Sequence, residues 1–146
     1  MNAVLKPNHT EDTNRQTIEA MVDAFVNHDL DAMMALFNDD CRYEDMIGRG
    51  KNGQVSVGKQ AIRQTFASQI KRLPPHTFEN AVIIVSGNQA HANWDLVMGN
   101  KSEYRVRGCD YFELQDGKIT LKSAWLKNHD SVRWQALRLK LLSFFE

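Results

Sequence analysis

Two aspartates, Asp45 and Asp110, are the residues of this sequence best suited to acid–base chemistry. Asp110 lies in a stretch, 103–114, whose even positions carry no other charge and include Val106 and Phe112. The odd positions carry the arginines and glutamates, so a shift of one residue would bury several charges. This alternation predicts a strand with Asp110 on its buried face.

A shorter alternation, at 41–46, puts Asp45 on the same face as Cys41 and Tyr43. Burial disfavours an ionised carboxylate, and two neighbouring carboxylates disfavour double ionisation. One of the pair can then hold a proton while the other accepts one, which suits proton abstraction beside a carbonyl group. The alternative is that Asp110 bonds a buried backbone amide or a water molecule and that Asp45 only begins a loop.

The neighbouring strands are expected to complete an apolar pocket around the two carboxylates. In the last predicted strand, 118–127, alternation puts Ser123 and Trp125 inward and Lys122 outward. Trp94 is a candidate for stacking against a ligand, and core packing explains it equally well. The residues expected to contact a ligand are Met21, Tyr43, Phe66, Trp94, Met98, Tyr104 and Trp125.

Hydrophobic periodicity predicts an α+β fold in which three helices precede a long antiparallel meander. The glycine-rich stretch 48–58 is expected to be a loop, and it lacks the GK[ST] ending of a phosphate-binding loop. Thr13 and Gln16 fit a capping box for the first helix, and Asp29 or Asp31 can cap the second. The predicted helices cover 13–27, 30–37 and 59–71, and the predicted strands cover 41–46, 76–86, 89–99, 103–114 and 118–127.

One domain is expected at 12–130, after a loose polar arm at 1–11. Residues 131–146 form a leucine-rich amphipathic pattern with arginines on its polar side. Such a helix can lie on a membrane surface or in a partner's groove. We expect it to pack on its own domain or on a second copy of the chain.

The composition argues against several classes of partner. Among 146 residues, 18 Lys and Arg balance 18 Asp and Glu, so neither nucleic acid nor an acidic membrane is an expected partner. The start of the chain lacks the apolar segment of a secretory signal, and two cysteines make no disulfide framework. A cytoplasmic protein is expected. The histidines lack metal-ligand spacing, so neither a metal nor another cofactor is predicted.

The predicted order of elements and the segment NHDLDAMMALFNDDCRYEDMIG (27–48) resemble the nuclear transport factor 2-like superfamily. The resemblance covers about residues 13–128, and within the superfamily it is to the SnoaL-like and ketosteroid isomerase-like group. It implies a cone-shaped, curved antiparallel sheet wrapped around N-terminal helices and enclosing a pocket. It also implies a homodimer, formed through a half-polar outer sheet face that would include Cys109, Ala124 and Leu126.

Ketosteroid isomerases carry their general base on a Glu-Asp pair followed by proline and glycine. The segment 44–48 is similar, with Met46 in place of the proline, so the resemblance implies that Asp45 is the base. It also implies that Asp110, just before an apolar pair, stabilises the oxyanion. The tyrosines of that site fall at Met21, Phe37 and Phe66, so steroid isomerisation itself is not expected; Tyr43 or Tyr104 is a candidate for the missing hydroxyl.

Together these features predict a SnoaL-like, isomerase- or cyclase-type enzyme that acts on a small apolar carbonyl compound through Asp45 and Asp110. Polyketide cyclases of the group also use a pocket aspartate. An epoxide hydrolase of this fold is not expected, since Ser123 and Trp125 stand where it needs a carboxylate. The alternative is a non-catalytic domain of the same fold that binds a small ligand or acts as a dimeric scaffold.

Overall fold

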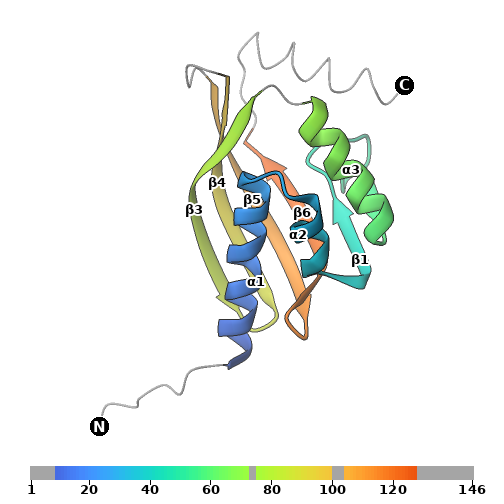
Figure 1. Ribbon diagram of the computed structural model, residues 1–146, viewed down its shortest axis with the longest axis vertical. Coiled ribbons are helices and arrows are strands. Elements are labelled where there is room, and N and C mark those ends of the chain that lie inside the picture. Colours follow the sequence, from blue (N-terminus) through green and yellow to red (C-terminus); the bar gives the residue numbers. More distant parts are fainter. Residues whose placement is uncertain (1–8, 73–74, 100–103, 128–146) are drawn as a thin grey trace.

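The computed structural model describes residues 9–72, 75–99 and 104–127 as an α+β domain, with helices lying on one face of a curved sheet (Figure 1). The side chain of Tyr104 and the predicted helix at 131–146 lie outside the described part. In chain order the elements are α1 (His9–Val26), α2 (Leu30–Leu36), β1 (Phe37–Glu44), β2 (Val55–Val57), α3 (Lys59–Arg72), β3 (His76–Ser86), β4 (Gln89–Met98), β5 (Tyr104–Gln115) and β6 (Lys118–Leu126).

The six strands form one sheet in the order β2-β1-β6-β5-β4-β3. The predicted antiparallel meander from β3 to β6 is confirmed, but β1 pairs with β6 in parallel, so the sheet is mixed. A parallel pair needs a long crossover connection, which the chain between β1 and β6 supplies. The stretch 48–58, predicted as a loop, contains the short edge strand β2.

The predicted cap is wrong for helix α1 and confirmed for helix α2. Helix α1 begins at His9, before the expected cap, and the Thr13 hydroxyl donates to the His9 carbonyl from inside the helix. Residues 9–11 therefore belong to a helix rather than to the predicted arm. In α2 the prediction is confirmed, because the Asp29 carboxylate accepts a hydrogen bond from the Ala32 amide at 2.9 Å.

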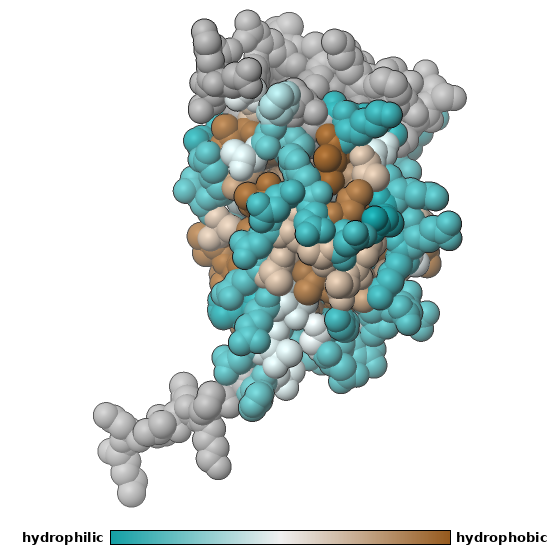
Figure 2. All heavy atoms as spheres, in the orientation of Figure 1, coloured by the Kyte–Doolittle hydropathy of each residue, from teal (hydrophilic) through white to brown (hydrophobic). Residues whose placement is uncertain are grey.

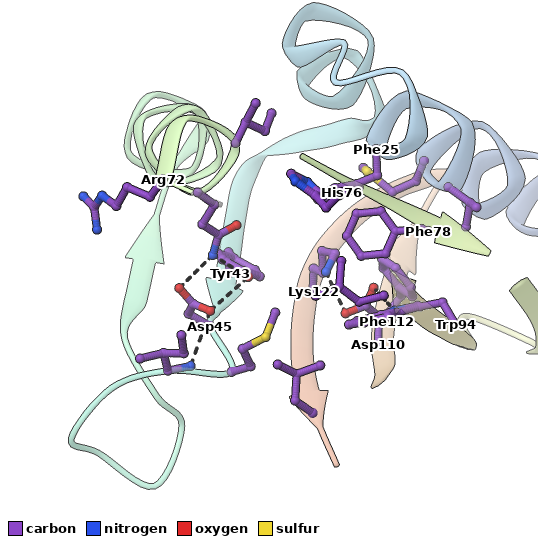
Figure 3. Close-up of a pocket in the computed structure, with 18 residues that line it drawn as sticks. Phe25, Tyr43, Asp45, Arg72, His76, Phe78, Trp94, Asp110, Phe112 and Lys122 are labelled. Carbon is purple, nitrogen blue, oxygen red and sulfur yellow. Dashed lines mark hydrogen bonds and ion pairs between the residues drawn. The ribbon is translucent and has the colours of Figure 1, made fainter. Parts of the chain in front are cut away.

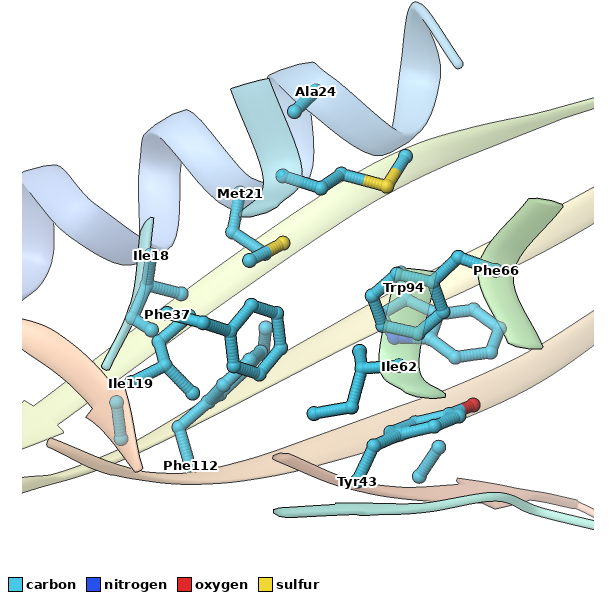
Figure 4. Close-up of a cluster of buried hydrophobic side chains, with 14 of the residues drawn as sticks. Ile18, Met21, Ala24, Phe37, Tyr43, Ile62, Phe66, Trp94, Phe112 and Ile119 are labelled. Carbon is cyan, nitrogen blue, oxygen red and sulfur yellow. The ribbon is translucent and has the colours of Figure 1, made fainter. Parts of the chain in front are cut away.

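The core lies between the helices and the concave face of the sheet. Figure 4 shows Ile18 and Met21 of α1 in one cluster with Phe37, Phe66 and Phe112, and each of the five is 0–1% exposed. The outer side of the helices is mostly polar, with apolar side chains gathered between them (Figure 2). None of the helices in the described ranges is long and apolar enough to cross a membrane.

A single extra residue in β6 changes which side chains face the core. Leu114 pairs with Ile119 but Glu113 pairs with Leu121, so Thr120 is a bulge, and it donates a hydrogen bond to the Glu113 carbonyl. Because strand side chains alternate, one inserted residue reverses the facing of everything after it.

The predicted inward face of β6 is therefore wrong beyond the bulge. Trp125 points outward and is 53% exposed, whereas Lys122 points inward and is 3% exposed. Ala124 pairs with Asp110 and Leu126 with Gly108, so both lie on the inner face rather than on the expected outer one.

The indole of Trp94 lies directly against the backbone of the next strand at Gly108. The two residues are paired across β4 and β5, and a β-carbon at Gly108 would overlap the Trp94 ring. Glycine is therefore required here by close approach of the ring rather than by backbone conformation.

We expect Gly108→Ala to lower the free energy of unfolding by about 1–3 kcal/mol, because the added methyl overpacks a buried aromatic contact. Urea denaturation would measure the change. Gly50→Ala is the matched control, since a β-carbon at Gly50 would lie in ordinary contact, 3.6 Å from the Gly53 carbonyl oxygen. Equal stabilities of the two variants would contradict the close approach.

Candidate active site

A cavity of about 100 Å³ lies between the helices and the inner face of the sheet (Figure 3). A single water needs only about 10–15 Å³ on the same measure, so the cavity can accept a small organic molecule. Its wall is mainly apolar, formed by residues that include Met21, Val22, Phe25, Phe78, Leu96 and Phe112. Besides Trp94, seven polar side chains of the described ranges reach it, namely Tyr43, Asp45, Gln69, Arg72, His76, Asp110 and Lys122.

Asp45 lies just after β1 and is held by hydrogen bonds from three directions. Gln69 of α3 donates to its Oδ2 at 2.8 Å, while the Tyr43 hydroxyl and the Ile47 amide lie 3.4 Å from its Oδ1. Gln69 also donates to the Tyr43 hydroxyl at 3.2 Å. Tyr43, Asp45 and Gln69 therefore form a closed ring of hydrogen bonds, seen in Figure 3.

The backbone beyond β1 fixes the position of Asp45. Its amide donates to the Gln54 carbonyl at 2.8 Å, and the Gln54 amide donates back to the Ile47 carbonyl at 2.8 Å. Gly53 passes so close to the Asp45 carbonyl that a β-carbon there would overlap it, and its φ of +65° also favours glycine. The glycine-rich stretch therefore braces the carboxylate.

Burial raises the pKa of the Asp45 carboxyl, because the ionised form loses its water. Hydrogen bonds from Gln69 and from the Ile47 amide oppose that rise, as does the nearby charge of Lys122. Burial also raises the pKa of Tyr43 well above its usual range, so its hydroxyl stays protonated. The site thus holds a poorly solvated carboxyl beside a neutral hydroxyl.

Asp110, on β5, accepts hydrogen bonds at both oxygens. The Lys122 ammonium donates to Oδ1 at 2.7 Å and the Trp94 indole donates to Oδ2 at 2.9 Å. A lysine ammonium can only donate, so Asp110 is an acceptor in this pair. The bulge at Thr120 brings Lys122, which alternation predicted to face outward, to the inner face of the sheet beside Asp110.

The residues expected to contact a ligand fall into two groups. Met21, Tyr43 and Trp94 line the cavity together with the two aspartates. Phe66 and Met98 are buried in the core and do not line it; Phe66 packs edge-on against Tyr43, with 4.8 Å between ring centroids. Trp125 faces the opposite side of the sheet.

Sequence reasoning missed three polar residues of the site, Gln69, Arg72 and Lys122. Gln69 lies on the same side of its predicted helix as Phe66 and Ile70, a spacing that could have indicated it. Nothing in the alternation of β6 indicates Lys122, because the bulge is invisible in the pattern. Among the described residues no group of three or more potential ligands could hold a metal ion.

The sequence matches the family model of the SnoaL-like domain over residues 18–122. The chain belongs to the SnoaL-like family. The resemblance found at 27–48 is thereby confirmed. No curated protein sequence matches this SnoaL-like chain.

Solved structures agree with the family assignment. An NTF2-like protein of unknown function from Mesorhizobium loti has a TM-score of 0.71 at 25% identity, covering 84% of this chain and 98% of its own. A proposed polyketide cyclase from Xanthomonas campestris has a TM-score of 0.69 at 18% identity, and the match covers 88% of this chain and 98% of that protein's chain. A proposed ketosteroid isomerase from Kribbella flavida has a TM-score of 0.68 at 15% sequence identity. The match covers 83% of this chain and 82% of that protein's chain. The last two likenesses show the fold alone.

The buried pair predicts a non-additive response to mutation. Lys122→Met should destabilise the fold by about 3–5 kcal/mol, because Asp110 keeps a buried charge without its counter-charge. Adding Asp110→Asn should recover much of that loss, since asparagine removes the charge and still accepts from Trp94. A double-mutant cycle by urea denaturation at neutral pH measures the coupling. Additive losses would show that the pair is not coupled.

Proposed function

We propose that this SnoaL-like protein is an acid–base enzyme that removes a proton from the carbon beside a carbonyl group in a small, largely apolar compound. The observation that carries the proposal is Asp45, a carboxyl with a raised pKa in the wall of an apolar cavity. A base whose pKa is shifted toward the working pH transfers protons efficiently.

In the proposed reaction the Asp45 carboxylate takes the proton; the electron pair of the broken C–H bond forms a C=C bond while the π pair of the carbonyl moves onto its oxygen, which gives an enolate. Asp45 then returns the proton to another carbon, which gives an isomer. In the cyclase-type variant the enolate carbon instead attacks a second carbonyl of the same molecule and closes a ring; the π bond of that carbonyl breaks, and its oxygen takes the proton held by Asp45. Asp110 and its partners Trp94 and Lys122 form a polar end of the cavity, which would stabilise the carbonyl oxygen as it gains negative charge.

The alternative function is binding without chemistry. One observation favours it: Asp45 and Asp110 both already have partners in the structure, as expected of satisfied buried carboxylates. A binding domain would keep its ligand affinity when Asp45 becomes asparagine and would never exchange the ligand's protons. The two functions therefore differ in one measurable property.

Exchange of the ligand's carbon-bound protons tests the proposal. A panel of apolar β,γ-unsaturated ketones and 1,3-dicarbonyl compounds would be incubated in D₂O and followed by NMR. We expect exchange by the wild type to fall by about 10²–10⁴-fold in Asp45→Asn. Since burial raises the pKa of Asp45, the rate should rise with pH through that raised pKa and then level off, as the base ionises.

Glu44→Gln is the matched control for this test. Glu44 is the adjacent carboxylate in sequence, and it bonds Arg42 and Ser123 instead of lining the cavity. Its loss should leave exchange nearly unchanged. Exchange that is equal in wild type and Asp45→Asn would exclude Asp45 as the base and favour the binding function.

The homodimer remains a prediction. Because the bulge in β6 places Trp125 on the outer face of the sheet, the surface through which two copies would pair differs from the one expected from the sequence. Trp125, Val82 and Ile84 are all more than half exposed, so association through the outer sheet face would cover them. We expect Trp125→Glu to shift the mass measured by light scattering from dimer to monomer. A monomeric wild type at micromolar concentrations would contradict the prediction.

A further inference from the structure

We propose that Lys122 is the residue that binds the charged oxygen of the ligand, and that the cavity accepts small, apolar molecules with an enolate- or phenolate-type oxygen. In this arrangement Asp110 is a positioning residue. The inference deepens the proposed function, since it assigns the partner of the oxygen that gains charge when Asp45 removes a proton.

The first step is where Lys122 lies. Its side chain is 3% exposed and yet lines the cavity, so its ammonium is withdrawn from bulk water and still faces the space that a ligand would fill. A charge held in such surroundings acts more strongly on a nearby charge than it would in water.

The second step is how Lys122 is held. One donor points to Asp110 at 2.7 Å, and that carboxylate is itself fixed by the Trp94 indole at 2.9 Å. The ammonium lies 5.1, 5.2 and 5.7 Å from the ring centroids of Phe25, Tyr43 and Phe112. Aromatic faces attract a cation, and these rings also shield the ammonium from water. The donor is therefore positioned before any ligand arrives.

The third step is the charge balance around the ammonium. Asp110 accepts one of the three donors of the Lys122 ammonium, so a ligand oxygen that gains negative charge can accept another. A neutral carbonyl or phenol costs little to bury, and it gains attraction from the ammonium only as its oxygen becomes negative. Asp45 and Lys122 line the same cavity (Figure 3), and the charge of Lys122 lowers the pKa of the Asp45 carboxyl. A C–H group can then face Asp45 while the oxygen faces Lys122.

Ionisation of bound phenols tests this inference without any catalysis. The probes are 4-nitrophenol, followed by absorbance, and 2-naphthol, followed by fluorescence, each titrated with pH at saturating protein. We expect the wild type to favour the phenolate by about ten- to one-hundred-fold over free solution, as for one charge-assisted hydrogen bond. Lys122→Met should abolish that preference, and Asp45→Asn should retain it.

Two variants keep the test decisive. Lys118→Met is the matched control, because Lys118 is an exposed lysine at the start of the same strand that bonds the Ala35 carbonyl. If Lys122→Met fails to fold, Lys122→Met/Asp110→Asn removes the charge and its counter-charge together and should lose the same preference.

Other results would overturn the assignment. Equal phenolate preference in wild type and the Lys122 variants, or no preference for either probe in the wild type, would exclude Lys122 as the oxygen-binding residue. Phenolate binding without proton exchange on the carbonyl panel would instead remove the proposed function and leave this inference standing.

Discussion

The buried ion pair between Lys122 and Asp110 is the interaction on which the arrangement of the cavity depends. An ammonium that is 3% exposed requires a counter-charge close by, and Asp110 is placed to supply it from the adjacent strand. Trp94 then bonds the other oxygen of Asp110, and its ring fits against the sheet only because position 108 is glycine. One electrostatic requirement thus links the packing of three neighbouring strands.

The second polar end of the cavity is organised by different forces. Within the described ranges no cation lies in hydrogen-bond contact with Asp45, and its partners there are an amide side chain, a hydroxyl and a backbone amide. Desolvation raises its pKa, and these neutral donors offset only part of that cost. The cavity therefore contains one carboxylate matched to a cation and another with a raised pKa that is held by neutral donors. Two chemically identical side chains thus lie in different environments.

The sequence reasoning succeeded where a pattern repeated over many residues. Strand β5 alternates over its twelve residues, so the inward facing of Asp110 followed from the cost of burying the opposite face. The meander and the helix capped by Asp29 were likewise predictable from local chemistry. The start of α1 was not, because Glu11 in its first turn accepts a hydrogen bond from the distant amide of Gly87.

By itself the sequence determined the fold class, the family resemblance and two inward aspartates, since each follows from periodicity or from residues close together along the chain. Only the tertiary structure decided what accompanies those aspartates. Thr120 adds one residue to β6 against β5, and that offset exchanges Trp125 for Lys122 in the inner face. Gln69 reaches Asp45 from a helix 24 residues away. Strand register and helix docking depend on contacts between distant segments, and alternation within one segment does not encode them.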